Sequence, residues 1–245
     1  LMLFLRLVVC VLSALSGVVG LVAGVWFGLQ GLARGIDLGR SRTERGGSGL
    51  MIPGLFLLLL VFLLVRPSFI IFSERGSAAQ HAPYLISLGV GLLLGGLAQR
   101  SRFCITGIIR DSLLMGTRSP LFWGFCAFTG GALATSLATG QFHLGLYGQP
   151  GAHNEFLWSF LGMLLVGWLS VLIGGCPFRQ LVKAGEGDAD AGLVVIGMLL
   201  GGGLVQSWGV AATAAGVSLA GKAAVLVGLA FIMVLSLLVR ERTTG

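Results

Sequence analysis

The sequence predicts an all-α membrane protein with about seven transmembrane helices and two short re-entrant or half helices. Its 245 residues are 56% hydrophobic and only 10% charged, and the mean hydropathy is +0.96. About a quarter of the residues are charged in an ordinary water-soluble domain, so that class of protein is excluded. The 41 glycines indicate spans that contact one another closely or contain breaks, because glycine lets helix backbones approach and weakens a helix interior.

Seven apolar runs are long enough to cross a hydrocarbon core of about 30 Å, which needs roughly 20 helical residues. In chain order the predicted spans are 7–29, 50–72, 83–98, 121–139, 156–173, 192–208 and 221–239.

Two further apolar segments, 105–115 and 178–184, are too short to cross, and each follows a cysteine. At membrane depth such a helix is tolerated only where protein or water covers its free backbone groups. In the pair Cys176-Pro177 the proline fits the first helical position, because its missing N–H would be unpaired there. Cys176 is therefore the predicted N-cap of a short helix, and Cys104 takes the same place in the earlier segment.

The two cysteine segments predict a duplicated unit, in which a full span and a break precede a cysteine, a short helix and another full span. Cys104 and Cys176 are 72 residues apart, and the predicted repeats cover about 85–139 and 156–208. Both repeats lie in a predicted transmembrane domain, 50–245. Residues 1–49 are a predicted junction, in which a span leads into an arginine-rich linker at 31–49 that joins two halves.

A thiol at the start of a helix meets the positive end of the helix dipole, which favours an anion and lowers the pKa of the thiol. The competing interpretation is a small buried apolar residue, because free cysteine is among the most buried residue types. We expect that role for Cys10 and Cys126, which lie in mid-span away from charge. Cys104 and Cys176 lie at breaks beside arginines, and ionisable groups at membrane depth are costly unless they are used. We therefore expect both to be functional.

Charged residues near the breaks have two interpretations each. Arg102, Arg110 and Arg179 either draw an anion towards a pore or anchor the chain on the cytoplasmic side. Asp111 is either the ion-pair partner of Arg110 or a helix cap.

Metal and catalytic sites are not indicated by the sequence. Glu186, Asp188 and Asp190 would suit a cation, but acidic residues before a span also cap a helix N-terminus, and we favour capping. His143 and His153 have a spacing that fits neither a helix nor a turn, so we expect a solvated loop. The sequence holds no Ser/His/Asp set, phosphate-binding glycine loop or zinc motif, so we expect neither an enzyme nor a cofactor.

The distribution of Lys and Arg predicts the orientation of the chain in the membrane. Its net charge of +7 is explained by cytoplasmic loops rather than by nucleic-acid binding. The C-terminus is then cytoplasmic and the N-terminus outside. Because the chain also begins with Leu1 rather than methionine, we expect a portion of a longer protein. Twelve of the 16 Lys and Arg residues lie on the predicted cytoplasmic side: Arg34, Arg40, Arg42, Arg45, Arg100, Arg102, Arg110, Arg118, Arg179, Lys183, Arg240 and Arg242.

The two cysteine segments resemble those of the YeeE/YedE family of membrane proteins, which transport sulfur compounds such as thiosulfate and in one branch are linked to selenium metabolism. The similar segments are 102–111, which reads Arg-Phe-Cys-Ile-Thr-Gly-Ile-Ile-Arg-Asp, and 174–191, which begins Gly-Gly-Cys-Pro-Phe-Arg-Gln-Leu. The second is the more specific, and its Ala-Gly-Glu-Gly-Asp extension is closest to the selenium-linked branch. The resemblance covers most of the chain from Gly20 onward.

The resemblance implies inverted repeats whose short re-entrant helices meet at a central constriction. It also implies a transporter of a small sulfur- or selenium-containing oxyanion in the inner membrane. Longer family members carry a similar cysteine pair in an earlier half, so we expect either a missing N-terminal half or a homo-oligomer. The residues expected along the substrate path are Cys104, Cys176, Arg102, Arg110, Arg179 and Gln180. Those expected to support the path are Gly107, Asp111, Gly174, Gly175 and Pro177.

Two alternatives to a transporter stay open. The thiolates could carry sulfur or selenium covalently in a membrane transferase, although no second thiol or histidine base lies near either cysteine in the sequence. The chain could instead be a non-transporting subunit that docks a soluble cytoplasmic sulfurtransferase through the linker at 31–49.

Overall fold

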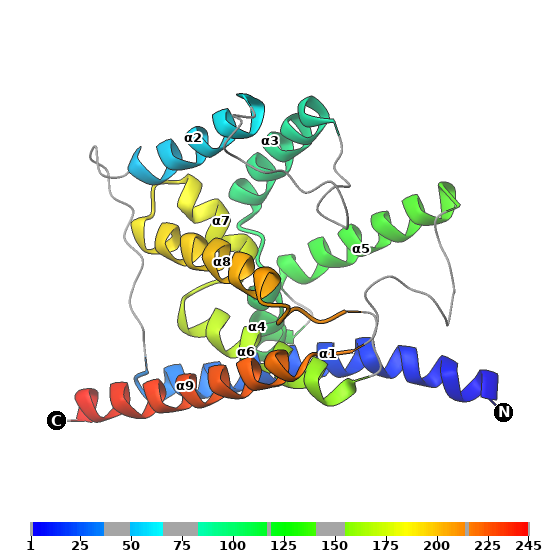
Figure 1. Ribbon diagram of the computed structural model, residues 1–245, viewed down its shortest axis with the longest axis vertical. Coiled ribbons are helices and arrows are strands. Elements are labelled where there is room, and N and C mark those ends of the chain that lie inside the picture. The colour runs from blue at the N-terminus through cyan, green and yellow to red at the C-terminus, as the bar shows by residue number, and fades with distance from the viewer. Residues whose placement is uncertain are drawn as a thin grey trace. The chain divides into compact units, whose positions relative to one another are not determined.

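The computed structural model describes residues 2–36, 50–65, 83–116, 119–140, 155–213 and 216–244, with side chains from residue 15 to residue 238 of these ranges. Every named element in this part of the chain is a helix, so the predicted all-α class is confirmed. The predicted linker beyond Ile36, and His143 and His153, lie outside the described residues. Figure 1 shows the helices α1 (Met2–Ala33), α2 (Met51–Val65), α3 (Tyr84–Ser101), α4 (Ile105–Met115), α5 (Pro120–Ala138), α6 (Phe156–Leu172), α7 (Pro177–Gly185), α8 (Ala189–Ser207) and α9 (Leu219–Thr244).

Five helical stretches of the described chain are long and apolar enough to cross a membrane, so the protein is a multi-pass helical membrane protein. Two of the seven predicted spans correspond to α2 and α3, which are not among these five. Helix α2 has 15 residues, and its predicted continuation past Val65 lies outside the described residues. Helix α3 ends in the polar sequence Gln99-Arg100-Ser101. The five stretches are Leu15–Ala33, Pro120–Ala138, Phe156–Gly185, Ala189–Ser207 and Leu219–Leu238.

Apolar side chains cover the outside of these spans, as contact with lipid requires. Helix α5 buries none of its side chains, and Trp123 on it is 64% exposed. The prediction that Cys126 is a small buried residue is wrong, because Cys126 is exposed on α5. A thiol is apolar enough to face lipid as readily as it fills a core.

The chain divides into two compact units. Unit 1 consists of Leu1–Arg40, Cys104–Cys176 and Met198–Gly245, and unit 2 consists of Ser41–Phe103 and Pro177–Gly197. The middle segment of unit 1 therefore begins with one of the two predicted functional cysteines and ends with the other. The domains predicted from the sequence, 1–49 and 50–245, stay predictions.

In unit 1, helices α1 and α6 lie side by side with their backbones in close contact (Figure 1). A Cβ atom at Gly20 or Gly24 would meet the backbone of Phe160 or Leu164, and one at Gly167 would meet the backbone of α1. Residues four apart share one face of a helix, so Gly20 and Gly24 form a strip along which α6 packs. This contact is the close helix packing that the glycine content indicates.

A small apolar core lies where α6 meets α9 in unit 1. Its buried residues are Ile36, Leu172 and Ile232, and Trp168 packs against them. The Trp168 ring also stacks on Phe27 of α1, with ring centroids 5.7 Å apart. Helix α6 is thus held on one side by α1 and on another by α9.

An ion pair joins the first turns of α6 and α9. The Nζ atom of Lys222 lies 2.8 Å from Oε2 of Glu155, which directly precedes α6. The Lys222 ammonium also lies 5.6 Å from the centroid of the Trp158 ring. Further along both helices Leu165 lies beside Gly228 and Leu172 shares a core with Ile232, so α6 and α9 run in the same direction within unit 1.

Unit 2 is built around α7, which contacts α2 and α3. The ring of Phe103, after α3, meets the ring of Phe178 edge to face, with centroids 6.1 Å apart. Ile52 of α2 fills the space beside Gly192 of α8, where an added Cβ would lie 2.6 Å from Ile52 Cγ1. Helix α7 therefore contacts α2 and α3 within its own unit, and α2 also packs against α8.

Candidate functional site

The helix before Cys104 ends with a left-handed residue. Arg102 has φ 52°. The N–H groups of Arg102 and Phe103 donate to the carbonyls of Gln99 (3.4 Å) and Ala98 (3.3 Å). This Schellman pattern satisfies carbonyls that the helix end would leave unpaired, and it turns the chain sharply two residues before the cysteine.

The helix before Cys176 ends in the same way. Gly174 has φ 76°. The N–H groups of Gly174 and Gly175 donate to the carbonyls of Val171 (3.2 Å) and Ser170 (2.8 Å). The left-handed residue again lies two positions before the cysteine. Gly174 and Gly175 therefore do form the break, as predicted, and the local turn is repeated at both cysteines.

Each cysteine immediately precedes a short helix. Helix α4 occupies Ile105–Met115, the range predicted, and Cys104 is its N-cap with an extended backbone (φ −154°, ψ 117°). The Cys104 Sγ accepts a hydrogen bond from the N–H of Gly107 at 3.4 Å. Helix α7 begins at Pro177, directly after Cys176. The predicted places of both cysteines at short-helix starts are thus confirmed.

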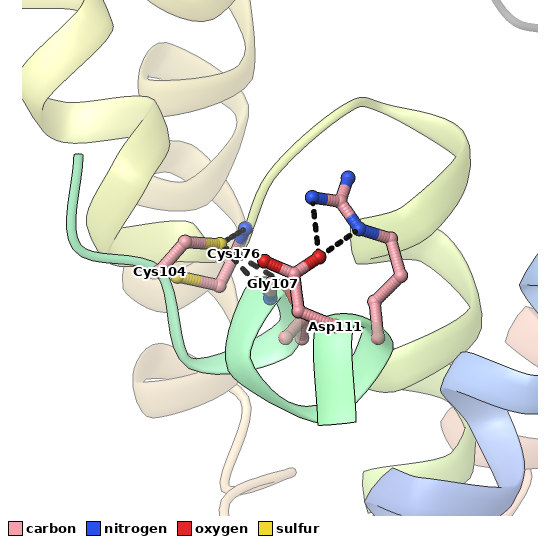
Figure 2. Close-up of polar contacts among 6 residues, drawn as sticks. Cys104, Gly107, Asp111 and Cys176 are labelled. Carbon is pink, nitrogen blue, oxygen red and sulfur yellow. Dashed lines mark hydrogen bonds and ion pairs between the residues drawn. The ribbon is translucent and has the colours of Figure 1, made fainter. Parts of the chain in front are cut away.

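The two cysteines contact each other within unit 1. The N–H of Cys176 donates to the Sγ of Cys104 at 3.3 Å, and the Cys176 thiol makes a further hydrogen bond to the same sulfur. The Oγ1 atom of Thr106 lies 3.4 Å from it. Figure 2 shows the contacts of the Cys104 sulfur with Cys176 and Gly107. Both cysteines are buried, with Cys104 8% and Cys176 3% exposed.

These hydrogen bonds favour the charged form of the Cys104 sulfur. Cys104 lies between α3 and α4, outside the five candidate spans. The side-chain hydrogen bond from Cys176 is the largest cause, and the N–H of Cys176, Thr106 and the N–H of Gly107 act in the same direction, while burial opposes them. Together they lower the pKa of the Cys104 thiol to about 5, because hydrogen bonds to a charged form stabilise it.

Two predicted supporting residues lie in the first turns of α4. A Cβ atom at Gly107 would lie 3.1 Å from Cys104 Cβ and 3.4 Å from its Sγ, so the missing side chain leaves room for the sulfur. Asp111 accepts a hydrogen bond from Arg110 Nε at 2.9 Å, and Figure 2 shows its carboxylate in this ion pair. The ion-pair interpretation of Asp111 is therefore confirmed. The Arg110 side chain is 50% exposed.

Three of the other four predicted path residues, Arg102, Arg179 and Gln180, belong to unit 2, and Arg110 belongs to unit 1. Arg102 is exposed. Arg179 Nη1 lies 3.7 Å from Oε1 of Glu186 in an ion pair, and Gln180 is buried in α7. Among the predicted path residues, Cys104 and Cys176 are in contact, and the roles of the others stay predictions.

The acidic residues after α7 act as caps and partners. Asp188 Oδ1 accepts a hydrogen bond from the N–H of Ala191 at 3.0 Å, so the predicted capping of α8 is confirmed at this residue. Glu186 pairs with Arg179. No group of three His, Cys, Asp or Glu residues that could hold a metal ion occurs in the described part of the chain.

Thr106 is the site residue that the sequence analysis missed. Its hydroxyl reaches the Cys104 sulfur from the first turn of α4. The available signal was a polar residue two positions after a predicted N-cap, where side chains return towards the start of the helix.

Comparison of the chain with protein-family models, with curated proteins and with solved structures found no match. A function is therefore argued from the cysteine pair, the short helices and the membrane spans.

Proposed function

We propose that this protein is a membrane transporter for a small sulfur- or selenium-containing oxyanion, such as thiosulfate or selenite, and that Cys104 and Cys176 line its path. The observation that carries the proposal is the contact between these cysteines, which are 72 residues apart in the chain and 3.3 Å apart at Cys176 N and Cys104 Sγ. Each precedes a helix too short to cross the bilayer. The resemblance of both segments to the YeeE/YedE family supports the same substrate class.

The groups around Cys104 suit an anion that must both enter and leave. The N–H groups of Gly107 and Cys176 converge on one point, at the N-terminus of α4, where the helix dipole also favours negative charge. A thiol adds a weak donor on a polarizable sulfur. Contacts of this strength hold an ion long enough to admit it and release it readily, as conduction requires.

The charge on Cys104 makes the proposal dependent on pH. A thiolate at Cys104 repels an anion and occupies the N–H donors itself. Protonation of Cys104 removes the repulsion and frees these donors for the substrate. We therefore expect uptake to increase as the pH falls from about 8 towards the Cys104 pKa of about 5.

Uptake of radiolabelled thiosulfate and selenite into liposomes that contain the purified chain tests the proposal. At about pH 5, where Cys104 is largely protonated, we expect Cys104→Ala and Cys176→Ala to lower uptake about tenfold or more, because each removes hydrogen bonds to the ion that are together worth about 1.5 kcal/mol or more. Cys126→Ala is the matched control, because Cys126 is exposed on α5 and its loss should leave uptake unchanged. Undiminished uptake in both test variants would reject the thiol path.

Transport by the purified chain also separates this function from that of a non-transporting subunit. A subunit that only docks a soluble sulfurtransferase predicts no uptake by liposomes that lack the partner.

A second candidate function, a covalent sulfur carrier, is favoured by one specific observation. The Cys176 thiol contacts a Cys104 sulfur whose pKa is lowered to about 5, so a nucleophile and a second thiol are neighbours although the sequence separates them. The Cys104 thiolate would attack the outer sulfur of thiosulfate. A new S–S bond forms, the S–S bond of thiosulfate breaks, and sulfite leaves with the electron pair.

Peptide mass spectrometry after exposure to thiosulfate distinguishes the two functions. The carrier predicts a Cys104 peptide heavier by one sulfur atom, lost on treatment with a thiol reductant. Uptake without this adduct supports transport and excludes the carrier.

A further inference from the structure

We propose that Cys104 and Cys176 form a reversible redox pair, which peroxide oxidises to an intramolecular disulfide. The proposal adds a modification site to the chain and does not need the transport function to be correct. Where transport does occur, the disulfide would stop it, because neither a thiol donor nor a protonatable sulfur remains.

The geometry brings both sulfurs within reach of each other. The Cys176 thiol makes a hydrogen bond to Cys104 Sγ, and the Cys176 N–H lies 3.3 Å from that sulfur. Figure 2 shows the two cysteines as neighbours. Neither is in a disulfide bond, and both belong to the segment Cys104–Cys176 of unit 1. A disulfide would therefore join the two ends of that segment.

The surroundings assign the two sulfurs different roles. The Cys104 sulfur accepts hydrogen bonds from two backbone N–H groups and from the second thiol. It is therefore the group that holds negative charge and attacks first, since the thiolate is the nucleophile of cysteine chemistry. Cys176 donates to it and is placed to resolve the product. The lowered pKa of Cys104 agrees with this order.

The reaction balances with hydrogen peroxide as the oxidant. The Cys104 thiolate attacks one peroxide oxygen, so that an S–O bond forms, the O–O bond breaks and hydroxide leaves with the electron pair. Sulfur is oxidised to a sulfenic acid and peroxide oxygen is reduced. Cys176 then gives up its proton and attacks the Cys104 sulfur. The S–S bond forms, the S–O bond breaks, and the hydroxide leaves as water with that proton.

Peptide mapping of the full wild-type chain in detergent tests the proposal. After treatment with hydrogen peroxide and alkylation of the remaining thiols, we expect a cross-linked pair of peptides containing Cys104 and Cys176. Dithiothreitol should release the two peptides unmodified. The proposal is overturned if Cys104 and Cys176 are both alkylated as in the untreated protein, or if Cys104 reaches sulfinic acid while Cys176 stays free.

Cysteine variants test the disulfide and the role of each thiol without any measurement of transport. A Cys10→Ser/Cys126→Ser chain retains only the pair, and we expect peroxide to abolish alkylation of both thiols while the chain stays monomeric on a non-reducing gel. With Cys176→Ser added, the sulfenic acid on Cys104 should persist and react with dimedone. With Cys104→Ser instead, Cys176 should show no dimedone adduct. An adduct on Cys176 of equal yield would contradict the assigned roles.

Discussion

The sulfur of Cys104 accepts hydrogen bonds from two backbone N–H groups and is also buried, and these two features act on its charge in opposite directions. Burial disfavours the thiolate and the donors favour it. The donors prevail, and the pKa falls to about 5. Because this pKa lies below that of the unfolded chain, the thiolate contributes stability that is complete above the unfolded value near 9 and is lost as the pH falls through about 5.

The pH dependence of alkylation reports this state directly. For wild-type Cys104 we expect the rate of iodoacetamide labelling to be level between about pH 6 and about pH 8, since the thiol is already ionised there. Cys176→Ala removes the largest cause of the lowered pKa, so its rate at Cys104 should rise with pH over the same range. Peptide-resolved mass spectrometry measures both rates. A wild-type rate that rises about tenfold per pH unit over this range would show an ordinary thiol.

Arg102 is held in a conformation that suits glycine. Its φ of 52° is left-handed, which costs a residue with a side chain roughly 1 kcal/mol or more. Arg102→Gly should therefore unfold at a higher temperature in detergent than Arg102→Ala, although both remove the same charge. Gly174→Ala tests the same strain in the opposite direction. Gly174 has φ 76° at the equivalent position, so the added side chain should lower the unfolding temperature. Equal stability of the two Arg102 variants would contradict the strain.

At the scale of helices, the packing of α1 on α6 depends on glycine. The backbone of α6 approaches Gly20 and Gly24 so closely that a methyl group has no space. In the membrane, close backbone contact of this kind drives helix association through van der Waals packing, because lipid is as apolar as the side chains.

Gly24→Ala should destabilise the protein, although alanine is the better helix former. The new Cβ would meet the carbonyl of Leu164, and overpacking of this kind costs about 1–3 kcal/mol. Gly201→Ala in α8 is the matched control, because no atom lies within 4 Å of the added Cβ and the helix gains roughly 1 kcal/mol from the change. Thermal unfolding in detergent should therefore shift in opposite directions for the two variants. Equal shifts would show that the α1 and α6 backbones are not in contact.

Local features of the fold were predictable from sequence to the extent that neighbours in the chain determine them. The bounds of α4 follow from the N-cap Cys104 and from Gly116, whose left-handed backbone (φ 66°) ends the helix. The partner of the glycine strip on α1 does not follow, because a strip of small residues shows that a helix packs closely but not against which helix. Helix α6 supplies that partner from about 140 residues further along the chain.

The candidate site was predictable in its residues but not in its contacts. A turn two residues before each cysteine and a helix directly after it are local features, so Cys104 and Cys176 could be paired by pattern. The donors to the Cys104 sulfur include the N–H of Cys176, and a backbone group of a residue 72 positions away carries no sequence signal. The lowered pKa of Cys104 could be predicted from the helix dipole. Its largest cause, the hydrogen bond from the Cys176 side chain, could not, because it comes from a distant part of the chain.

At the scale of the whole molecule, the relative directions of the spans constrain which ends can lie on the cytoplasmic side. The Lys and Arg residues beside the spans should agree with that arrangement. The ion pair Glu155–Lys222 joins the starts of α6 and α9, and these helices run the same way in unit 1. The sequence between α5 and α6 has no Lys or Arg from 140 to 155, whereas Arg240 and Arg242 lie at the end of α9. Lys and Arg next to a span resist translocation, so the ends of α9 and of α6 should lie on the cytoplasmic side.

Reporter fusions test this orientation in cells. A green fluorescent protein at the C-terminus should fluoresce, and alkaline phosphatase at the same point should be inactive, because the first folds in the cytoplasm and the second needs disulfides that form outside it. Alkaline phosphatase inserted between α5 and α6 should be active. The charges should be the cause, so replacing Arg240 and Arg242 with Gln while adding Lys residues to the sequence between α5 and α6 should weaken the asymmetry between the two fusion sites. Phosphatase activity at the unmodified C-terminus would show that the chain has the opposite orientation. The starts of α6 and α9 would then face the cytoplasm, and both cysteine breaks would open to the other side of the membrane.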